Sequence, residues 1–216
     1  MTISAMTSAP LRDSAGIEEL LGASLGLRER KKLKTRRAIR AAAFRRFAEQ
    51  GYEATTIDQI AGDADISPST FFRYFPTKED LVIRDDYDPL LESALRARPA
   101  NESLVESIRH AMMEPLREII AVDHDDMLTR MRILIDNPVV NARNQAEMHR
   151  TRDMLLNVFC ERNGRSPEDL ELRVQIAAFL AATFETILYW AQRDGQDDIV
   201  TLLEQALDAV AKGFNH

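Results

Sequence analysis

Residues 55–75 carry the stretch that decides the fold, TTIDQIAGDADISPSTFFRYF. Thr56 precedes an apolar helical pattern as an N-cap, because its hydroxyl can accept a hydrogen bond from a free N–H of the first turn. Ser67 and Pro68 mark a second helix start, with serine as the cap and proline at the first helical position. Between the two, Asp65 tolerates the left-handed backbone of a tight turn better than most residues. The stretch therefore predicts two short helices joined by a tight turn.

The apolar side chains around this turn fit a helix-turn-helix. Ala61 is small enough to let the second helix cross the first closely, and Ile66 supplies an apolar plug after the turn. Phe71 and Phe75 are one turn apart in the second helix, so we expect both to be buried.

Polarity and charge indicate a nucleic-acid partner at this end of the chain. Ser69 and Thr70 open the second helix with short polar side chains, which suit contact with base edges in the major groove. Residues 28–50 include ten basic and two acidic residues, although the whole chain carries a net charge of −7. This asymmetry suggests nucleic-acid binding. A solvated helix face also explains a basic run when it is taken alone.

The rest of the sequence predicts an all-α protein with about nine helices in all, because apolar residues recur at helical spacing and strand signals are nearly absent. Pro115 lies inside a periodic stretch, so we expect a kink there. Helix breaks are expected at Gly51, Pro89, Pro99, Val122-Asp123, Asn137-Pro138, Asn163-Gly164 and Asp194-Gly195. The last long helices are expected over residues 167–193 and about 197–214.

These boundaries divide the chain into three parts: a flexible N-terminal arm (1–27), a three-helix helix-turn-helix domain for DNA binding (28–80), and a larger helical domain for ligand binding and dimerisation (81–216). The arm lacks the apolar core of a signal peptide. The single cysteine, Cys160, excludes an intrachain disulfide, so we expect a cytoplasmic protein. No apolar run reaches the about 18 residues of a membrane helix, so no membrane partner is expected.

Residues 35–81 resemble the DNA-binding domain of the TetR/AcrR family of transcriptional regulators. The resemblance is carried by TRRAIRAAAF at 35–44, TTIDQIA at 55–61, ISPSTFFRYF at 66–75 and TKEDL at 77–81. It implies phosphate contacts at Thr56 and Lys78, base contacts at Ser69 and Phe72, contacts with the DNA backbone at Thr70, Arg73 and Tyr74, and a place near the DNA backbone for Arg36 and Arg37.

Two positions depart from the family pattern. Asp65 stands in the turn where the family usually has glycine, and the left-handed backbone there costs about 1 kcal/mol more for aspartate. Phe72 stands where the family usually has tyrosine, so a hydroxyl and its hydrogen bond are lost, although contact with a thymine methyl stays possible. Phe72 and Tyr74 also fit a role as core aromatics.

The helix predicted over 167–193 is apolar on two sides, which means that other helices cover it on both. In the resembled family the last long helices pair across a two-fold axis as a four-helix bundle. On that basis the candidates for a homodimer interface are Val174, Ala177, Ala181, Leu188, Leu202, Ala206 and Val210. An intramolecular core is the alternative. A two-fold dimer places two recognition helices about 34–36 Å apart, or a multiple of this, on palindromic double-stranded DNA.

The middle helices are expected to enclose a pocket for a small apolar or acyl-type effector. Methionines and aromatic residues suit an adaptable lining, and the candidates are Met112, Met113, Met127, Met131, Ile135, Met148, Phe159, Phe179 and Phe184. Each also fits a plain core. Five arginines in this region could hold an anionic group, although surface ion pairs are the simpler interpretation: Arg130, Arg132, Arg143, Arg150 and Arg152.

No pattern indicates catalysis or a cofactor. The sequence has no nucleophile elbow, phosphate loop or Cys/His constellation, and His110 with Glu114 supplies only two ligand types for a metal. A helical-bundle enzyme and an interaction module that ignores DNA sequence remain the alternatives. We expect a sequence-specific, ligand-responsive transcriptional regulator, in most family members a repressor, that is not an enzyme.

Overall fold

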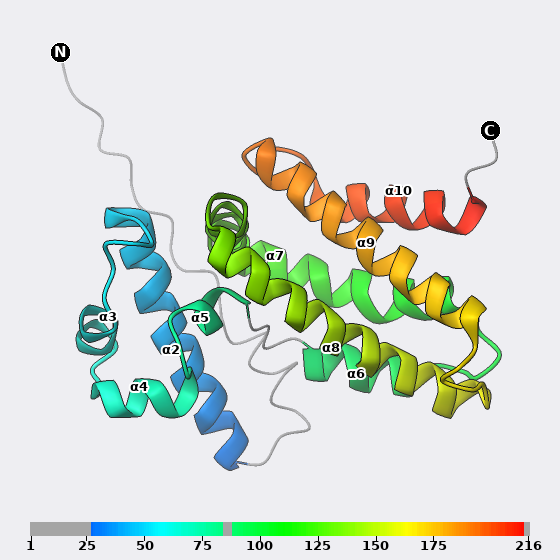
Figure 1. Ribbon diagram of the computed structural model, residues 1–216, viewed down its shortest axis with the longest axis horizontal. Coiled ribbons are helices and arrows are strands. Elements are labelled where there is room, and N and C mark those ends of the chain that lie inside the picture. The colour runs from blue at the N-terminus through cyan, green and yellow to red at the C-terminus, as the bar shows by residue number, and fades with distance from the viewer. Residues whose placement is uncertain (1–26, 84–87, 214–216) are drawn as a thin grey trace.

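The computed structural model describes residues 27–83 and 88–213, and all their regular structure is helical (Figure 1). No strand occurs within these ranges, so the predicted all-α class is confirmed. The predicted arm lies outside the described residues except for Leu27.

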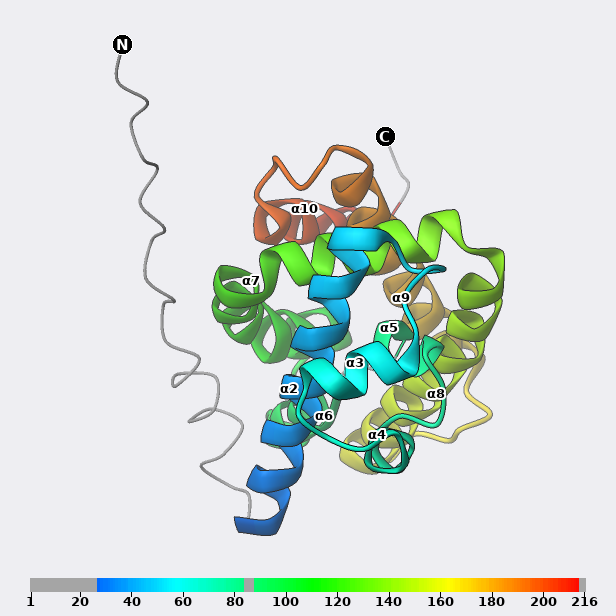
Figure 2. The same cartoon turned by 90° about the vertical axis from the view of Figure 1, so that its left-hand side faces the viewer.

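Four helices form the N-terminal end: α2 (Leu27–Gln50), α3 (Ile57–Asp63), α4 (Pro68–Tyr74) and α5 (Glu79–Ile83). Seen from this end, α3 and α4 lie at the outer surface next to α2 (Figure 2). Gly51 ends α2 with a φ of 86°, a left-handed backbone that favours glycine. Asp65 has a φ of 53°, and Ile66 N donates to Ala61 O at 2.9 Å, which closes the turn between α3 and α4 as predicted.

The helices α3 and α4 each begin at the cap that the sequence predicts. Thr56 Oγ1 accepts from Gln59 N, and Gln59 reaches back to the backbone of Thr56, which completes a capping box. Ser67 Oγ accepts from Thr70 N at 3.2 Å in front of Pro68. Before α5, Asp80 Oδ2 accepts from Thr77 N at 3.0 Å. Such caps satisfy N–H groups that the helix itself leaves unpaired.

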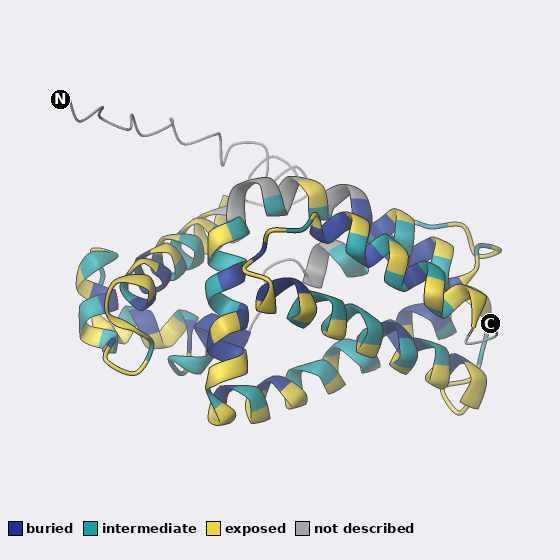
Figure 3. Ribbon diagram, turned by 90° about the horizontal axis from the view of Figure 1, so that it is seen from above, coloured by how far each residue is buried: buried dark blue, intermediate teal, exposed yellow. Residues whose placement is uncertain are grey.

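Five helices form the larger body: α6 (Asp88–Arg96), α7 (Leu104–Asp136), α8 (Pro138–Asn163), α9 (Leu170–Gln192) and α10 (Ile199–Lys212). The two halves share one apolar core, in which α5 packs against α7 and α8 while α2 also packs against α7. Every helix of the body carries buried residues, and Figure 3 shows buried segments in dark blue alternating with exposed segments along the ribbon. Phe71 and Phe75 are fully buried, as expected.

The structure corrects three predicted boundaries. α7 stays helical through Val122-Asp123, where a break was expected, although the ribbon turns sharply part-way along this helix (Figures 1 and 3). Valine and aspartate have only modestly lower helix propensity than alanine, so neither residue ends a helix by itself. α9 begins at Leu170 rather than at residue 167, because the Asp169 carboxylate caps it by accepting from Leu172 N. α10 begins at Ile199, after the cap at Asp198.

Gly195 lies in the tight turn after α9 and is the glycine that packing constrains most among those that the structure describes. Its φ is +66°, and a Cβ atom there would lie 3.0 Å from both His124 Nε2 and Trp190 Cζ2. His124 Nε2 lies 3.2 Å from Gly195 O, so the same contact ties α7 to the end of α9.

We expect Gly195→Ala to lower the free energy of unfolding by about 2–3 kcal/mol, because left-handed strain adds to the clash with two rings. Gly164→Ala is the matched control, since Gly164 has a φ of +63° and a Cβ atom there would meet no heavy atom within 4 Å. This substitution introduces left-handed backbone strain without a clash, so it should lower the free energy of unfolding by only about 1 kcal/mol. Urea denaturation followed by circular dichroism measures both, and equal costs would contradict the packing explanation.

Candidate DNA interface and ligand cavity

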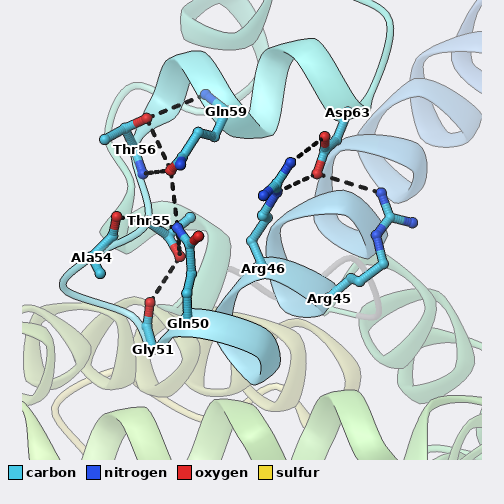
Figure 4. A network of polar contacts seen from close by, with 9 residues as sticks. All are labelled: Arg45, Arg46, Gln50, Gly51, Ala54, Thr55, Thr56, Gln59 and Asp63. Carbon is cyan, nitrogen blue, oxygen red and sulfur yellow. Dashed lines mark hydrogen bonds and ion pairs between the residues drawn. The ribbon is translucent and has the colours of Figure 1, made fainter.

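A polar network fixes α3 on α2 (Figure 4). The Arg46 guanidinium donates two hydrogen bonds to the Asp63 carboxylate, from Nε at 2.6 Å and from Nη2 at 2.8 Å. Arg45 approaches the same carboxylate at 3.6 Å. At the other end of α3, Gln50 Nε2 donates to Gln59 Oε1 at 3.0 Å. Because both ends of α3 are held, the turn and the start of α4 keep a fixed position relative to α2.

The outer face of α4 presents the side chains that the sequence assigns to DNA. Ser69 and Arg73 are exposed, Phe72 is 49% exposed, and Thr70 and Tyr74 are half-buried. Phe72 packs edge-on against Phe71 with ring centroids 5.6 Å apart, so its ring is braced from beneath while its other side stays open. A large apolar side chain with an open face fits contact with a thymine methyl.

The residues assigned to phosphates fall into two groups. Thr56 is exposed at the start of α3, and Arg37 is half-buried on α2. Arg36 instead donates from Nη1 to Tyr74 O at 3.0 Å and stacks 4.4 Å from the centre of the Phe75 ring. These contacts join α2 to the end of α4, so Arg36 supports α4, the helix that is predicted to contact DNA bases.

Lys78 also serves as an internal support. Its ammonium donates to Tyr52 O at 2.8 Å and to Thr55 O at 3.2 Å, and it lies 4.1 Å from the centre of the Tyr52 ring. An ammonium group has three donors, so one is left for a phosphate when two bind these carbonyls. The phosphate contact at Lys78 stays a prediction. The structural role was not foreseen, because it depends on the loop before α3.

Arginines from the body hold α5 at both ends. Arg143 on α8 donates from Nη1 to Thr77 Oγ1 at 2.7 Å and to Glu79 Oε2 at 3.1 Å. Arg130 on α7 donates from Nη2 to Ile83 O at 2.8 Å. Burial raises the pKa of the Glu79 carboxyl, but hydrogen bonds from its own backbone N–H and from the Thr77 and Tyr52 hydroxyls, together with the charge of Arg143, outweigh burial and hold the pKa below its ordinary value. The short α5 is therefore clamped between the DNA-facing helices and the body.

A cavity of about 250 Å³ lies among α5 to α10. Its lining is mostly apolar and includes Met112, Met127, Met131, Met148, Phe179 and Phe184 of the predicted set. The aliphatic residues Ile83, Leu91, Leu116, Leu134, Leu155, Leu180, Ile187 and Leu203 were not foreseen as lining. The polar side chains in the wall are Arg130, Asn144, Glu147, Thr151 and Thr183. A mostly apolar cavity with a few polar groups is typical of a small-molecule site.

Three predicted cavity residues lie elsewhere. Met113 is buried in the core on a different side of α7 from Met112, because successive helical residues point about 100° apart. Ile135 is 40% exposed for the same reason, one position after Leu134. Phe159 is fully buried one turn beyond the cavity wall, where the Arg162 guanidinium lies 5.2 Å from its ring centre.

The other candidate arginines bind nearby acids. Arg132 contacts Asp194 at 2.7 Å, Arg150 contacts Glu147 at 2.5 Å, and Arg152 contacts Asp153 at 2.7 Å. Together with Arg143, they follow the ion-pair interpretation. Within the described residues no group of three or more potential metal ligands comes together.

One face of α9 is apolar and open. Leu170 is 73% exposed and Val174 is 56% exposed, and Ala177 and Ala181 are exposed further along the helix. The remaining interface candidates are half-buried: Leu188, Leu202, Ala206 and Val210. By length and composition α9 could also cross a membrane, yet a core helix of a soluble protein passes the same test. Exposed contiguous apolar surface of this kind marks an interaction face.

A helix-turn-helix joined to an all-helical body with an internal cavity defines a DNA-binding transcriptional regulator. Residues 39–84 match the family described as bacterial regulatory proteins, tetR family, and residues 102–215 match the family described as MftR C-terminal domain. Because these matches cover most of the chain, the protein belongs to the TetR family of transcriptional regulators.

Several characterised proteins are similar over nearly their whole length. The transcriptional regulator TcmR of Streptomyces glaucescens is 29% identical over 86% of each chain. The TetR-family repressor FadR of Thermus thermophilus, solved with lauroyl-CoA, is 27% identical over 84% of this chain and 95% of its own, with a TM-score of 0.54. FadR of Bacillus subtilis, solved with stearoyl-CoA, shares the fold at a TM-score of 0.58 and 22% identity, over 82% of this chain and 98% of its own. These relatives are regulators rather than enzymes.

The ion pair between Arg46 and Asp63 gives a prediction for acid stability. Hydrogen bonding to Arg46 holds the pKa of Asp63 below its ordinary value of 3.8. A lowered pKa in the folded state stabilises the fold above the unfolded pKa, and this contribution is lost as the pH falls through the folded pKa. We therefore expect Asp63→Asn to lower the urea midpoint at neutral pH, and the difference from the wild type to shrink below pH 3.8.

Asp58→Asn is the control for this titration, because Asp58 is exposed in the first turn of α3 and makes no ion pair within the described residues. It should keep the pH dependence of the wild type. A difference between Asp63→Asn and the wild type that stays constant down to the lowest pH would mean that the carboxylate charge does not stabilise this unit.

Proposed function

We propose that this protein is a cytoplasmic, homodimeric repressor that leaves a palindromic operator when a small apolar or acyl-type effector enters the cavity. One observation carries the proposal: α5 belongs to both the cavity and the DNA-facing unit. Ile83 at the end of α5 lines the cavity, while Thr77 and Lys78, directly before α5, contact the body and the loop before α3. We place the boundary between the DNA-binding domain (28–80) and the ligand-binding domain (81–216) within this helix.

The proposed mechanism is a shift between two spacings of the reading helices. An effector that fills the cavity presses on Ile83 and on the helices α7 and α8, whose arginines hold α5. A movement of α5 is passed to α4 through the short segment between them. The effector can shift the equilibrium only by its difference in affinity for the two states. Operator and effector must therefore weaken each other's binding to the same extent.

The ligands of two relatives support an acyl-type effector. The two FadR proteins were solved with lauroyl-CoA and stearoyl-CoA. In this chain the mostly apolar cavity, with its methionines from α7 and α8, fits the acyl part of such a molecule.

The test is fluorescence anisotropy with the purified protein on DNA from upstream of its own gene, against scrambled DNA, at several salt concentrations. We expect a preference of about a thousandfold or more for the native fragment and a steep salt dependence from phosphate contacts. Addition of lauroyl-CoA then tests release. Equal, weak binding to native upstream DNA and scrambled DNA would count against an operator there, and tight binding that no acyl ligand weakens would count against the acyl-type effector.

Phe72→Ala should separate base contact from phosphate contact. Phe72 is braced by Phe71 and open on its outer side, so its loss should weaken operator binding by about 1–3 kcal/mol while binding to scrambled DNA stays the same. Ser93→Ala on α6 is the control, because Ser93 is exposed far from the reading helix and should change neither affinity. Equal weakening on both DNAs would assign Phe72 to stability instead.

The homodimer is proposed to form through the open face of α9 together with α10. Within the described residues this face places Leu170, Val174, Ala177 and Ala181 in solvent, and the small alanines allow a second helix to approach closely. A two-fold pair of α9 and α10 would form a four-helix bundle, which buries this surface and places one reading helix at each end.

Val174→Asp should convert the dimer into monomers at micromolar concentration, because a carboxylate would be buried without a partner at the centre of the interface. Val139→Asp on α8 is the matched control, since Val139 is 64% exposed and lies outside the proposed interface. Sedimentation velocity measures the mass of each variant. Monomeric wild-type protein, or a dimer that survives Val174→Asp, would contradict this interface.

A further inference from the structure

Two polar side chains in the cavity wall make no hydrogen bond within the described residues. Asn144 on α8 is 6% exposed, and its buried Nδ2 has no acceptor. Thr183 on α9 also lines the cavity, and its hydroxyl has no partner in the described part of the chain. Thr186, three positions later, behaves as helical threonines commonly do and donates to Ala182 O at 2.7 Å.

Packing alone does not explain an amide at position 144. A buried polar group without a partner destabilises a fold, and leucine of similar size would fill the same space without that penalty. Asn144 and Thr183 lie on neighbouring helices of one cavity, in a wall that is otherwise mostly apolar. Polar groups that have no protein partner on a cavity wall are available to a ligand.

The other polar side chains of the wall each make at least one hydrogen bond or ion pair within the described residues. Arg150 binds the Glu147 carboxylate at 2.5 Å, the Thr151 hydroxyl donates to Glu147 O at 3.3 Å, and Arg130 donates to Ile83 O. Glu147 lies three residues after Asn144 on the same side of α8 and also lines the cavity. An anionic group at Asn144 would approach Glu147, and a cationic group would approach Arg130. An uncharged group avoids both.

We propose, building on the ligand-binding function proposed above, that the effector carries an uncharged carbonyl or hydroxyl oxygen on a compact apolar body, and that Asn144 and Thr183 bind this oxygen. Rotation about Cβ–Cγ turns either end of the asparagine amide toward a ligand, and a threonine hydroxyl both donates and accepts. The cavity, at about 250 Å³, lies below the about 300–1,000 Å³ that is usual for drug-sized ligands, so the part inside is small.

Three naphthalenes of nearly the same shape test the proposal on the purified full chain without DNA. They are 2-acetylnaphthalene with a carbonyl, 2-isopropenylnaphthalene with a CH₂ group in place of the oxygen, and 2-naphthoate with a carboxylate. Naphthalene fluorescence reports binding. We expect the ketone to bind about tenfold more tightly than the hydrocarbon, as one buried hydrogen bond permits, and the carboxylate to bind most weakly.

Asn144→Leu and Thr183→Val should each reduce the preference of the wild type for the ketone, to about twofold or less for the double variant. Asn144→Leu should also raise the Tm of the ligand-free protein by about 2–4 °C, because an unpaired amide is removed from the interior. A merely structural asparagine would give a lower Tm. Asn157→Leu on α8 is the control, since Asn157 is exposed and should change neither the preference nor the Tm by more than the error.

The proposal is overturned if the hydrocarbon or 2-naphthoate binds as tightly as the ketone, if no probe binds, or if the variants keep the full preference. A separate readout concerns the regulatory function. If the ketone binds as expected but never releases operator DNA, the cavity chemistry stands and the repressor mechanism fails. If ketone and hydrocarbon release operator equally well, the mechanism stands and the assignment of Asn144 and Thr183 fails.

Discussion

The clamp on α5 is the constraint on which the rest of this structure depends. Arg143 binds the first turn of α5 from α8, Arg130 binds its last carbonyl from α7, and Lys78 fastens its start to the loop before α3. Between these contacts Leu81, Val82 and Ile83 are buried in the common core. A helix of little more than one turn has almost no stability by itself. Its position is therefore set entirely by the two units that it joins, and a change in either unit reaches the other through it.

The two units share one apolar core but differ in what adds to it. At the DNA-facing end, caps, a left-handed turn and the paired charges of Arg46 and Asp63 add local interactions within a short stretch of chain. The body is held by apolar burial among long helices that are distant in sequence, with a cavity left between them. Local interactions fix the reading helix closely, whereas an incompletely filled core has room to repack. This division suits a rigid reading head on a body that responds to a ligand.

The same division explains what the sequence can predict. The two caps and the turn depend only on backbone groups within a few residues of Thr56, Ser67 and Asp65. The helices and the turn around them can therefore be predicted from the local sequence. Val122 and Asp123 disfavour a helix only modestly, so a break expected there from the local sequence is misplaced. Met113 has a side chain that suits a cavity wall, but its position on α7 directs that side chain away from the cavity and into the core. Sequence patterns favour apolar residues for such a wall, so the unpaired polar groups became visible only in three dimensions.

Asn144 follows Arg143 directly on α8, so the side chain that faces the cavity and the side chain that clamps α5 share one turn of one helix. A ligand that makes only apolar contacts is stabilised wherever it fills the cavity. It can therefore bind without moving the turn of α8 that carries Asn144 and Arg143. A hydrogen bond to Asn144 makes binding depend on the position of α8, because the strength of the bond falls steeply with distance and angle. Any shift of α8 that improves this bond also shifts Arg143 relative to Thr77 and Glu79. The polar pair would then do more than select a ligand: it would couple the energy of binding to the clamp that positions the reading helix.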